Sequence, residues 1–135
     1  EVKKRITVAV AASGTTVTEV YGVGPIVAAL LIGHSGDITR FPTKGHYASY
    51  NGTAPIEASS GKVVRHRLNQ RGNRQLNHAL HVAAVTQISR DNPGRTYYLA
   101  KIEDGKSTKE ARRALKRKIS DAVFRQLRAD ARPQT

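Results

Sequence analysis

The stretch STKEARRALKRKISDAVFRQLRADA, residues 107–131, decides the fold class because it predicts one long amphipathic helix. Ser107 and Glu110 have the spacing of a capping box, in which two side chains satisfy backbone N–H groups at a helix start. Apolar residues then recur at helical spacing and form one face; they are Ala111, Leu115, Ile119, Ala122 and Val123. We therefore expect a mostly α fold whose last helix runs to about Ala131.

A basic stripe runs beside this apolar face; it comprises Lys109, Arg112, Arg113, Lys116 and Arg117. Charged residues on one side of a helix usually form its solvated face. The same spacing would also let the helix follow the phosphate backbone of a nucleic acid. The sequence leaves both interpretations open.

Two more helices are predicted upstream of this one. From about Arg71 to Arg90, apolar residues again recur at helical spacing; they are Leu76, Ala79, Leu80, Ala83, Ala84 and Ile88. The sequence Asn-Pro-Gly at 92–94 ends that helix, and a short helix follows over 95–102. Tyr97 and Tyr98 are expected to pack the last two helices together.

The start of the chain carries weaker signals. Residues 2–12 alternate like a strand at Ile6, Val8 and Val10, but their alanines and the basic turn before them favour a helix. Thr16 and Glu19 have the spacing of a capping box and would open a short helix through residue 20.

Three further segments of the first half also carry helix signals. Pro25 stands where a helix would begin and Gly33 where it would stop. Asp37 would cap a short turn through residues 40–41. Residues 43–50 look helical and close at Asn51-Gly52, which suits a left-handed stop.

The sequence Gly22-Val23-Gly24 lies between two of these expected helices, which is the pattern of a helix-hairpin-helix element. Its glycines let the backbone approach a partner closely, and free N–H groups at the next helix start point at a phosphate oxygen. Such a contact carries no base information. Gly22 and Gly24 are therefore candidate phosphate-binding residues, and a tight turn without a ligand is the alternative.

Residues 52–74 combine two serine hydroxyls with a dense run of cations. Ser59 and Ser60 come first, and the cations that follow are Lys62, Arg65, Arg67, Arg71 and Arg74. No acidic residue lies between Glu57 and Asp91. A hydroxyl among fixed cations suits attack on a phosphodiester or a grip on one, because cations stabilise charge that develops on the phosphoryl oxygens. Ordinary turn chemistry is the alternative role of the serines.

We expect this segment to be a long basic loop over 52–70, with a possible β excursion over 56–68. The positive charge of the chain is concentrated from this loop onward. The formal net charge is +13, and residues 62–135 hold eighteen Lys/Arg against six Asp/Glu, whereas residues 1–61 hold five against four. A polyanion is therefore the expected partner, and nucleic acid is the leading one.

Composition sets further bounds. A chain of 135 residues fits one domain with a single core, and no stretch approaches the ~20 apolar residues that span a bilayer. The absence of cysteine excludes disulfides and thiolate metal sites and fits a reducing compartment. The chain has no methionine and begins at Glu1, so we expect a fragment of a longer protein. His78 and His81 have no flanking carboxylate, and we expect no metal site in this chain.

Several of these elements, in this order and spacing, resemble the C-terminal domain of a bacterial insertion-sequence transposase family. The shared elements are Gly22-Val23-Gly24-Pro25, Phe41, Ala48-Ser49-Tyr50-Asn51-Gly52, Pro55, Ser60-Gly61 and Gln70-Arg71-Gly72-Asn73-Arg74-Gln75-Leu76-Asn77. The resemblance covers about residues 15–90 well, and 91–130 is similar to the tails of actinobacterial members. The family commonly has Lys at position 70 and Leu-Arg at 76–77, so this chain departs from it there.

The resemblance implies an RNA-guided (bridge-RNA) DNA recombinase that combines an N-terminal RuvC-like DEDD domain with this domain. Acidic residues of that absent domain would hold Mg²⁺, and no cofactor would bind this chain itself. In the family, a serine in the Ser-Gly pair five residues after the loop proline forms a phosphoserine intermediate with DNA. That position is Ser60 here, counted from Pro55, and Ser59 is the alternative.

We therefore expect a bacterial, cytoplasmic protein in which residues 1–14 end a linker helix, 15–90 form the core and 91–135 add C-terminal helices. Its partners would be DNA, a structured guide RNA and further copies of the full-length protein, with no membrane. One alternative is a non-catalytic helix-hairpin-helix module that binds DNA or guide RNA. Another is a basic assembly domain that only dimerises a parent enzyme.

Overall fold

The structure is a computed structural model that describes residues 1–55 and 72–132. Within those ranges every regular element is helical, which confirms the expected mostly α class. The elements are α1 (Val2–Ala12), η1 (Val17–Glu19), α2 (Pro25–Ser35), η2 (Ile38–Arg40), α3 (Lys44–Asn51), α5 (Arg74–Ser89), α6 (Pro93–Glu103) and α7 (Thr108–Ala131), where η1 and η2 are short 3₁₀ helices. The expected β excursion over 56–68 lies outside the described residues.

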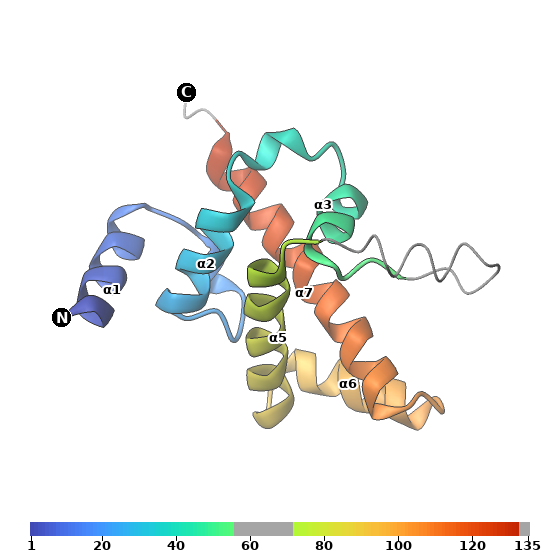
Figure 1. Ribbon diagram of the computed structural model, residues 1–135. Helices are drawn as coiled ribbons and strands as arrows, with labels where there is room; N and C mark the ends of the chain where they lie inside the picture. The colour runs from blue at the N-terminus through green and yellow to red at the C-terminus, as the bar shows by residue number, and fades with distance from the viewer. Residues whose placement is uncertain (56–71, 133–135) are drawn as a thin grey trace.

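The long helix α7 organises the packing (Figure 1). It contacts α3, α5 and α6, while α2 packs against both α5 and α1. The largest fully buried apolar side chains come from four of these helices; they are Leu31, Tyr47, Leu76, Leu80 and Leu115. Burial of each such side chain contributes about 1.5–3 kcal/mol, so this shared core holds the helices together.

The helix starts follow the sequence closely. The Ser107 hydroxyl accepts a hydrogen bond of 3.1 Å from Glu110 N, and Glu110 Oε1 accepts one of 2.9 Å from Ser107 N, which confirms the capping box of α7. Asp37 caps η2, as expected, and Thr43 caps α3 by accepting a hydrogen bond from His46 N. Pro25 is the first residue of α2, and residues 2–12 form a helix rather than a strand.

Two helix boundaries and one cap were predicted wrongly. The helix α2 continues through Gly33 to Ser35, because the left-handed position that ends it is Gly36, with φ of 61°. The helix α5 begins at Arg74 rather than near 71, since the Asn73 side chain caps it by accepting from Leu76 N. Thr16 makes no cap for η1; its hydroxyl lies 2.7 Å from Asp130 Oδ1, and its N–H donates to the same carboxylate.

The apolar face of α7 is shifted slightly from the predicted one. Ala122 is only half-buried, whereas Phe124 and Leu127 join the core. Tyr97 and Tyr98 of α6 are partly buried against that core, and Lys118 of α7 lies 4.8 Å from the centre of the Tyr97 ring. In the described part of the chain, no helix is both long and apolar enough to cross a bilayer.

Candidate nucleic-acid interface

The Gly22–Gly24 hairpin is fixed against the middle of α5. Gly22 has a positive φ of 88°, a conformation that favours glycine. Its Cα faces the backbone of α5 so closely that a Cβ there would lie 2.7 Å from the Ala83 carbonyl oxygen. Gln87 of α5 donates a hydrogen bond of 2.8 Å to the Tyr21 carbonyl. The turn is therefore held rigidly, as a backbone binding site for phosphate requires.

The start of α2 leaves donors free for such a contact. Gly24 is the N-cap residue and has no side chain to accept from the first N–H groups of the helix. Among the described residues, none accepts a hydrogen bond from Ile26 N or Val27 N. Arg90 lines the same shallow hollow as Gly22 and Gly24. Arg90 was not predicted as a site residue, and only the packing of α5 against the hairpin brings its cation there.

Residues 50–52 and 72–73, far apart in the sequence, are in direct contact. A Cβ at Gly72 would lie 2.8 Å from the Tyr50 carbonyl oxygen and 3.0 Å from Gly52 N. Asn73 N donates a hydrogen bond of 2.6 Å to the same Tyr50 carbonyl. Residues 50–52 and 72–73, which flank the segment with both candidate serines, are therefore joined at one place.

A polar network holds this junction to the rest of the fold. The buried Asn51 amide donates 2.9 Å to Ser120 Oγ of α7, and its carbonyl side-chain oxygen accepts from Thr53 N. Asn77 of α5 donates 3.1 Å to the Asn51 main-chain carbonyl and accepts 3.0 Å from Lys116 Nζ. Asn77 therefore has a structural role here.

His34, Tyr50 and Asn73 form a second group at the junction. Asn73 Nδ2 lies 3.5 Å from His34 Nδ1 and 3.4 Å from the Tyr50 hydroxyl oxygen. The hydrogen bond from Asn73, and then that from Arg40, hold the pKa of Tyr50 below its usual range. The position of His34 at this junction could not be predicted, because His34 is 39 residues from Asn73 along the chain.

A groove of about 640 Å³ opens beside the junction. One wall is formed by residues 52–55, and the other by Tyr97 and the first half of α7. The α7 wall carries three cations, Arg113, Lys116 and Arg117, together with one carboxylate, Glu110. Arg117 Nε is paired with Asp121 Oδ1 at 2.9 Å, whereas Arg113 and Lys116 form no ion pair with any described residue.

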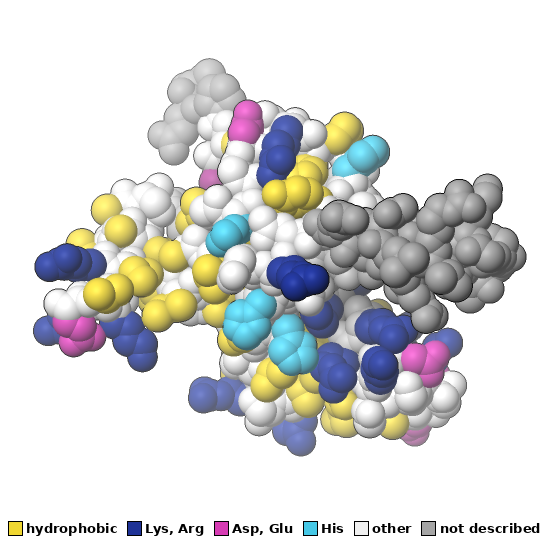
Figure 2. Space-filling view, in the orientation of Figure 1, with side chains coloured by type: hydrophobic (Ala, Val, Ile, Leu, Met, Phe, Trp, Pro, Cys, Tyr) yellow, Lys and Arg dark blue, Asp and Glu magenta, His cyan; other side chains and the backbone are white. Residues whose placement is uncertain are grey.

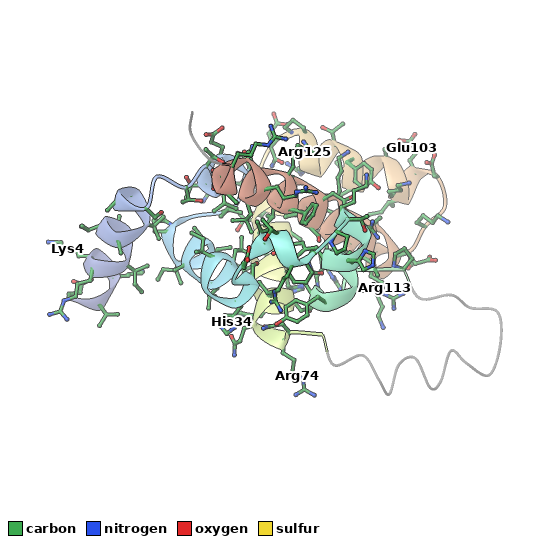
Figure 3. All side chains as sticks on the ribbon, turned by 90° about the horizontal axis from the view of Figure 1, so that it is seen from above. Lys4, His34, Arg74, Glu103, Arg113 and Arg125 are labelled. Atoms are coloured by element: carbon green, nitrogen blue, oxygen red, sulfur yellow. The ribbon has the colours of Figure 1, made fainter. Side chains whose placement is uncertain are left out.

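Most of the predicted catalytic and cationic residues lie outside the described part of the chain. They are Ser59, Ser60, Lys62, Arg65, Arg67 and Arg71. Arg74 is described; it is the exposed first residue of α5, and its side chain extends away from the helices, near His34 (Figure 3). A cation at a helix N-terminus opposes the helix dipole, so this position favours a nearby anion.

The structure separates two of the predicted contacts. The antiparallel packing of α2 and α5 puts Asn73 beside His34 at one end of this pair. It puts Gly22 beside Ala83 toward the other end. With a rise of about 1.5 Å per residue, the length of α2 separates the two by ~16 Å. The hairpin and Arg74 would therefore contact different phosphates.

The described residues contain no cluster of side chains with the composition of a metal site. No group of three or more His, Cys, Asp or Glu side chains lies together in 1–55 or 72–132 in a way that could hold an ion. His78 and His81 have cationic rather than acidic neighbours, because Arg112 and Lys116 both act on His81. The donors that Mg²⁺ prefers, carboxylate oxygens, are absent from that group.

Comparison with known proteins identifies the family. Residues 14–99 match the family described as Transposase IS116/IS110/IS902. A protein of insertion element IS110 from Streptomyces coelicolor is 39% identical over 112 residues, which is 82% of this chain and 28% of that protein. A protein of IS116 from Streptomyces clavuligerus is 32% identical over 108 residues, or 79% of this chain and 27% of that protein.

A third relative, from IS900 of Mycobacterium paratuberculosis, is 31% identical over 112 residues, which is 82% of this chain and 28% of that protein. This chain thus spans little more than a quarter of the length of these relatives. No solved structure matches it. The match over most of the chain and the identity to the three insertion-element proteins agree, and the chain belongs to the Transposase IS116/IS110/IS902 family.

Proposed function

We propose that this chain is the DNA-handling part of a transposase, and that Ser60 supplies the nucleophile for strand cleavage and exchange. Family membership supports the transposase role. The observation that carries the site is the junction of residues 50–52 with 72–73 beside the cationic groove. The segment with Ser60 begins and ends at that junction, which lies beside the groove.

In this proposal the cations near Ser60 stabilise the transition state of strand cleavage. The Ser60 oxygen attacks the phosphorus of a DNA phosphodiester and forms a phosphoserine ester. The P–O bond to one strand end breaks, and that end leaves as a hydroxyl that takes up a proton in place of the one lost by Ser60. Negative charge develops on the phosphoryl oxygens during attack and is stabilised by nearby fixed cations. Lys62, Arg65, Arg67 and Arg71 would supply this charge from the same segment, and Arg74 from the start of α5.

The hairpin would position the substrate rather than react with it. Gly24 and the free N–H groups at the start of α2 would bind a backbone phosphate at a fixed place. Holding the duplex about one helix length from Arg74 would orient the scissile phosphate for attack, and orientation lowers the barrier substantially.

Other parts of the reaction would come from outside this chain. Mg²⁺, held by acidic residues of a preceding RuvC-like domain, would polarise the scissile phosphate. A structured guide RNA would select the DNA site, and the full-length protein would act as an oligomer in the bacterial cytoplasm, where the DNA is. The described residues contribute phosphate-binding surfaces to this assembly.

A covalent-adduct assay tests the proposal. The full-length parent protein is incubated with Mg²⁺, guide RNA and cognate DNA, and protein–DNA adducts are separated on a denaturing gel. Wild type and Ser59→Ala should form the adduct, and Ser60→Ala should not. Full adduct formation by Ser60→Ala would overturn the assignment of the nucleophile.

The second candidate is a non-catalytic module that binds DNA or guide RNA. It is favoured by the hairpin, because a contact through backbone N–H groups needs no catalytic residue. The same assay separates the candidates. Cleavage of DNA by the wild-type protein without any adduct would support the binding module.

A further inference from the structure

The packing of α5 against α7 creates a cationic cluster that belongs to neither the hairpin nor the segment with Ser60. The cluster comprises His78 and His81 of α5 with Arg112 and Lys116 of α7. In Figure 2, histidine and Lys/Arg side chains gather over these two helices. Successive helix residues are rotated by about 100°, so His81 points away from the α5 side that touches Gly22 at Ala83.

The cluster has no counter-charge in the described residues. Neither Arg112 nor Lys116 forms an ion pair there. The two cations stand four residues apart on one helix, an arrangement of like charges that destabilises a helix. Burial, and then Arg112, lower the pKa of the half-buried Lys116. The fold therefore keeps two like charges close together, and no carboxylate of the described residues pairs with either of them.

The central cation of the cluster is also held in place. Lys116 Nζ donates 3.0 Å to Asn77 Oδ1, and the Asn77 amide is fixed in turn by its 3.1 Å hydrogen bond to the Asn51 carbonyl. An ammonium group has three donors, so this contact leaves Lys116 free to bind a further acceptor. Lys116 also lines the groove beside the junction, which connects the cluster to it.

We propose that this α5–α7 cluster binds backbone phosphates of a nucleic acid, as a second contact surface for the polyanion. A phosphate placed among Lys116, Arg112 and His81 would offset the repulsion between the two cations and would supply a further acceptor for Lys116. Phosphodiesters of DNA and of structured RNA offer the same chemistry, and the experiment separates these two sources. The inference rests on the proposed function only in taking nucleic acid as the partner.

A consequence of this geometry is that binding takes up protons. In the free protein, burial and then Lys116, Arg112 and His78 lower the pKa of His81. A bound phosphate supplies negative charge and raises that pKa, so the imidazole gains a proton on binding. Affinity should therefore be higher near pH 6 than near pH 8, and this difference should be larger in the wild type than in His81→Gln.

The test measures fluorescence anisotropy of a labelled random-sequence DNA duplex and of a labelled RNA hairpin with the purified chain. The variant Arg112→Gln/Lys116→Gln removes two cluster charges. Its matched control, Lys4→Gln/Arg5→Gln, removes two exposed charges from α1, where Lys4 lies at the opposite end of the molecule from Arg113 (Figure 3). A third variant, His81→Gln, is compared with wild type near pH 6 and pH 8.

The cluster variant should bind about tenfold more weakly, and its log–log salt slope should fall by about 2, because each phosphate contact contributes nearly one unit. The control should lose less than about threefold, from net charge alone. His81→Gln should flatten the pH dependence. A larger loss on one probe identifies DNA or RNA as the source of the phosphate.

Equal losses in the cluster variant and the α1 control would overturn the inference and leave the proposed function intact. No binding of either probe by the wild type would overturn both. Because Lys116 contacts Asn77, circular dichroism must show that the double variant is folded. The single variant Arg112→Gln keeps that contact. Its affinity for the probes should still be at least about threefold lower than that of the wild type.

Discussion

Gly22 lies against the carbonyl oxygen of Ala83, at a distance that leaves no room for a side chain at position 22. A Cβ at Gly22 would be 2.7 Å from that oxygen, and φ there is 88°. Gly24, two residues on, has an ordinary φ of −86°, and no described atom lies within 4 Å of where its Cβ would be. The first glycine is required by the fold, and the second is free to serve a ligand.

Replacing Gly22 by Ala should therefore destabilise the chain. The Cβ would strain the backbone at positive φ and would push the hairpin away from α5, for a cost of about 2–4 kcal/mol. Urea unfolding followed by circular dichroism measures this difference. Gly24→Ala is the matched control and should cost no more than about 1 kcal/mol; equal costs would contradict the packing of the hairpin.

Replacing Gly24 by Ser should separate stability from binding. A serine at the N-cap accepts from the free N–H groups of Ile26 or Val27 and should stabilise α2 by a few tenths of a kcal/mol. The same hydroxyl would occupy the donors proposed for phosphate, so DNA affinity should fall severalfold. Thermal unfolding and fluorescence anisotropy measure the two effects.

Gly33→Ser is the control for an added hydroxyl, because Gly33 lies in the same helix and a Cβ there meets no described atom within 4 Å. It should leave DNA affinity unchanged. Unchanged affinity in Gly24→Ser as well would show that the hairpin is a structural turn.

The buried Asn51 should be essential for the junction. Asn51→Ala removes the hydrogen bond to Ser120 Oγ and the acceptor of the Thr53 hydroxyl. Loss of buried hydrogen bonds of this kind costs about 2–3 kcal/mol. The exposed Ser49 on the same helix provides the control, since Ser49→Ala should change the free energy of unfolding by less than about 0.5 kcal/mol. A similar, small effect of both variants in urea unfolding would contradict the network.

The stability of the chain should depend on the protonation of His81. Burial, and then Lys116, Arg112 and His78, make the pKa of His81 lower in the folded than in the unfolded state. The unfolded state therefore binds more protons, and stability falls as the pH drops from about 8 to about 5. In His81→Gln the melting temperature should fall less over this range. If the melting temperature of His81→Gln follows that of the wild type over this range, the environment assigned to His81 is wrong.

Local signals allowed much of the fold to be predicted from the sequence. Ser107 with Glu110, Pro25 and Asn51-Gly52 act within a few residues, so their helix boundaries could be read directly. Thr16 was misjudged because its partner, Asp130, is 114 residues away. Gly33 was misjudged because a glycine within a helix can keep helical dihedral angles; the glycine that ends α2 is Gly36, where φ is positive, at 61°.

The candidate interface was predictable in its charge but not in its arrangement. The stretch without acids between Glu57 and Asp91 pointed to a polyanion. The meeting of His81 with Arg112 and Lys116 depends on how α5 packs against α7, which no local pattern specifies. The approach of Arg90 to the hairpin is likewise a result of tertiary packing.

Mass spectrometry of the protein–DNA adduct tests the central claim most directly. The adduct formed by the wild-type full-length protein is digested with nuclease and trypsin, and the peptide that retains a nucleotide is fragmented. Cleavage after Lys44 and Lys62 gives a peptide that contains both candidate serines. The account predicts that the nucleotide is on Ser60. A nucleotide on Ser59, or on a residue outside this chain, would contradict it.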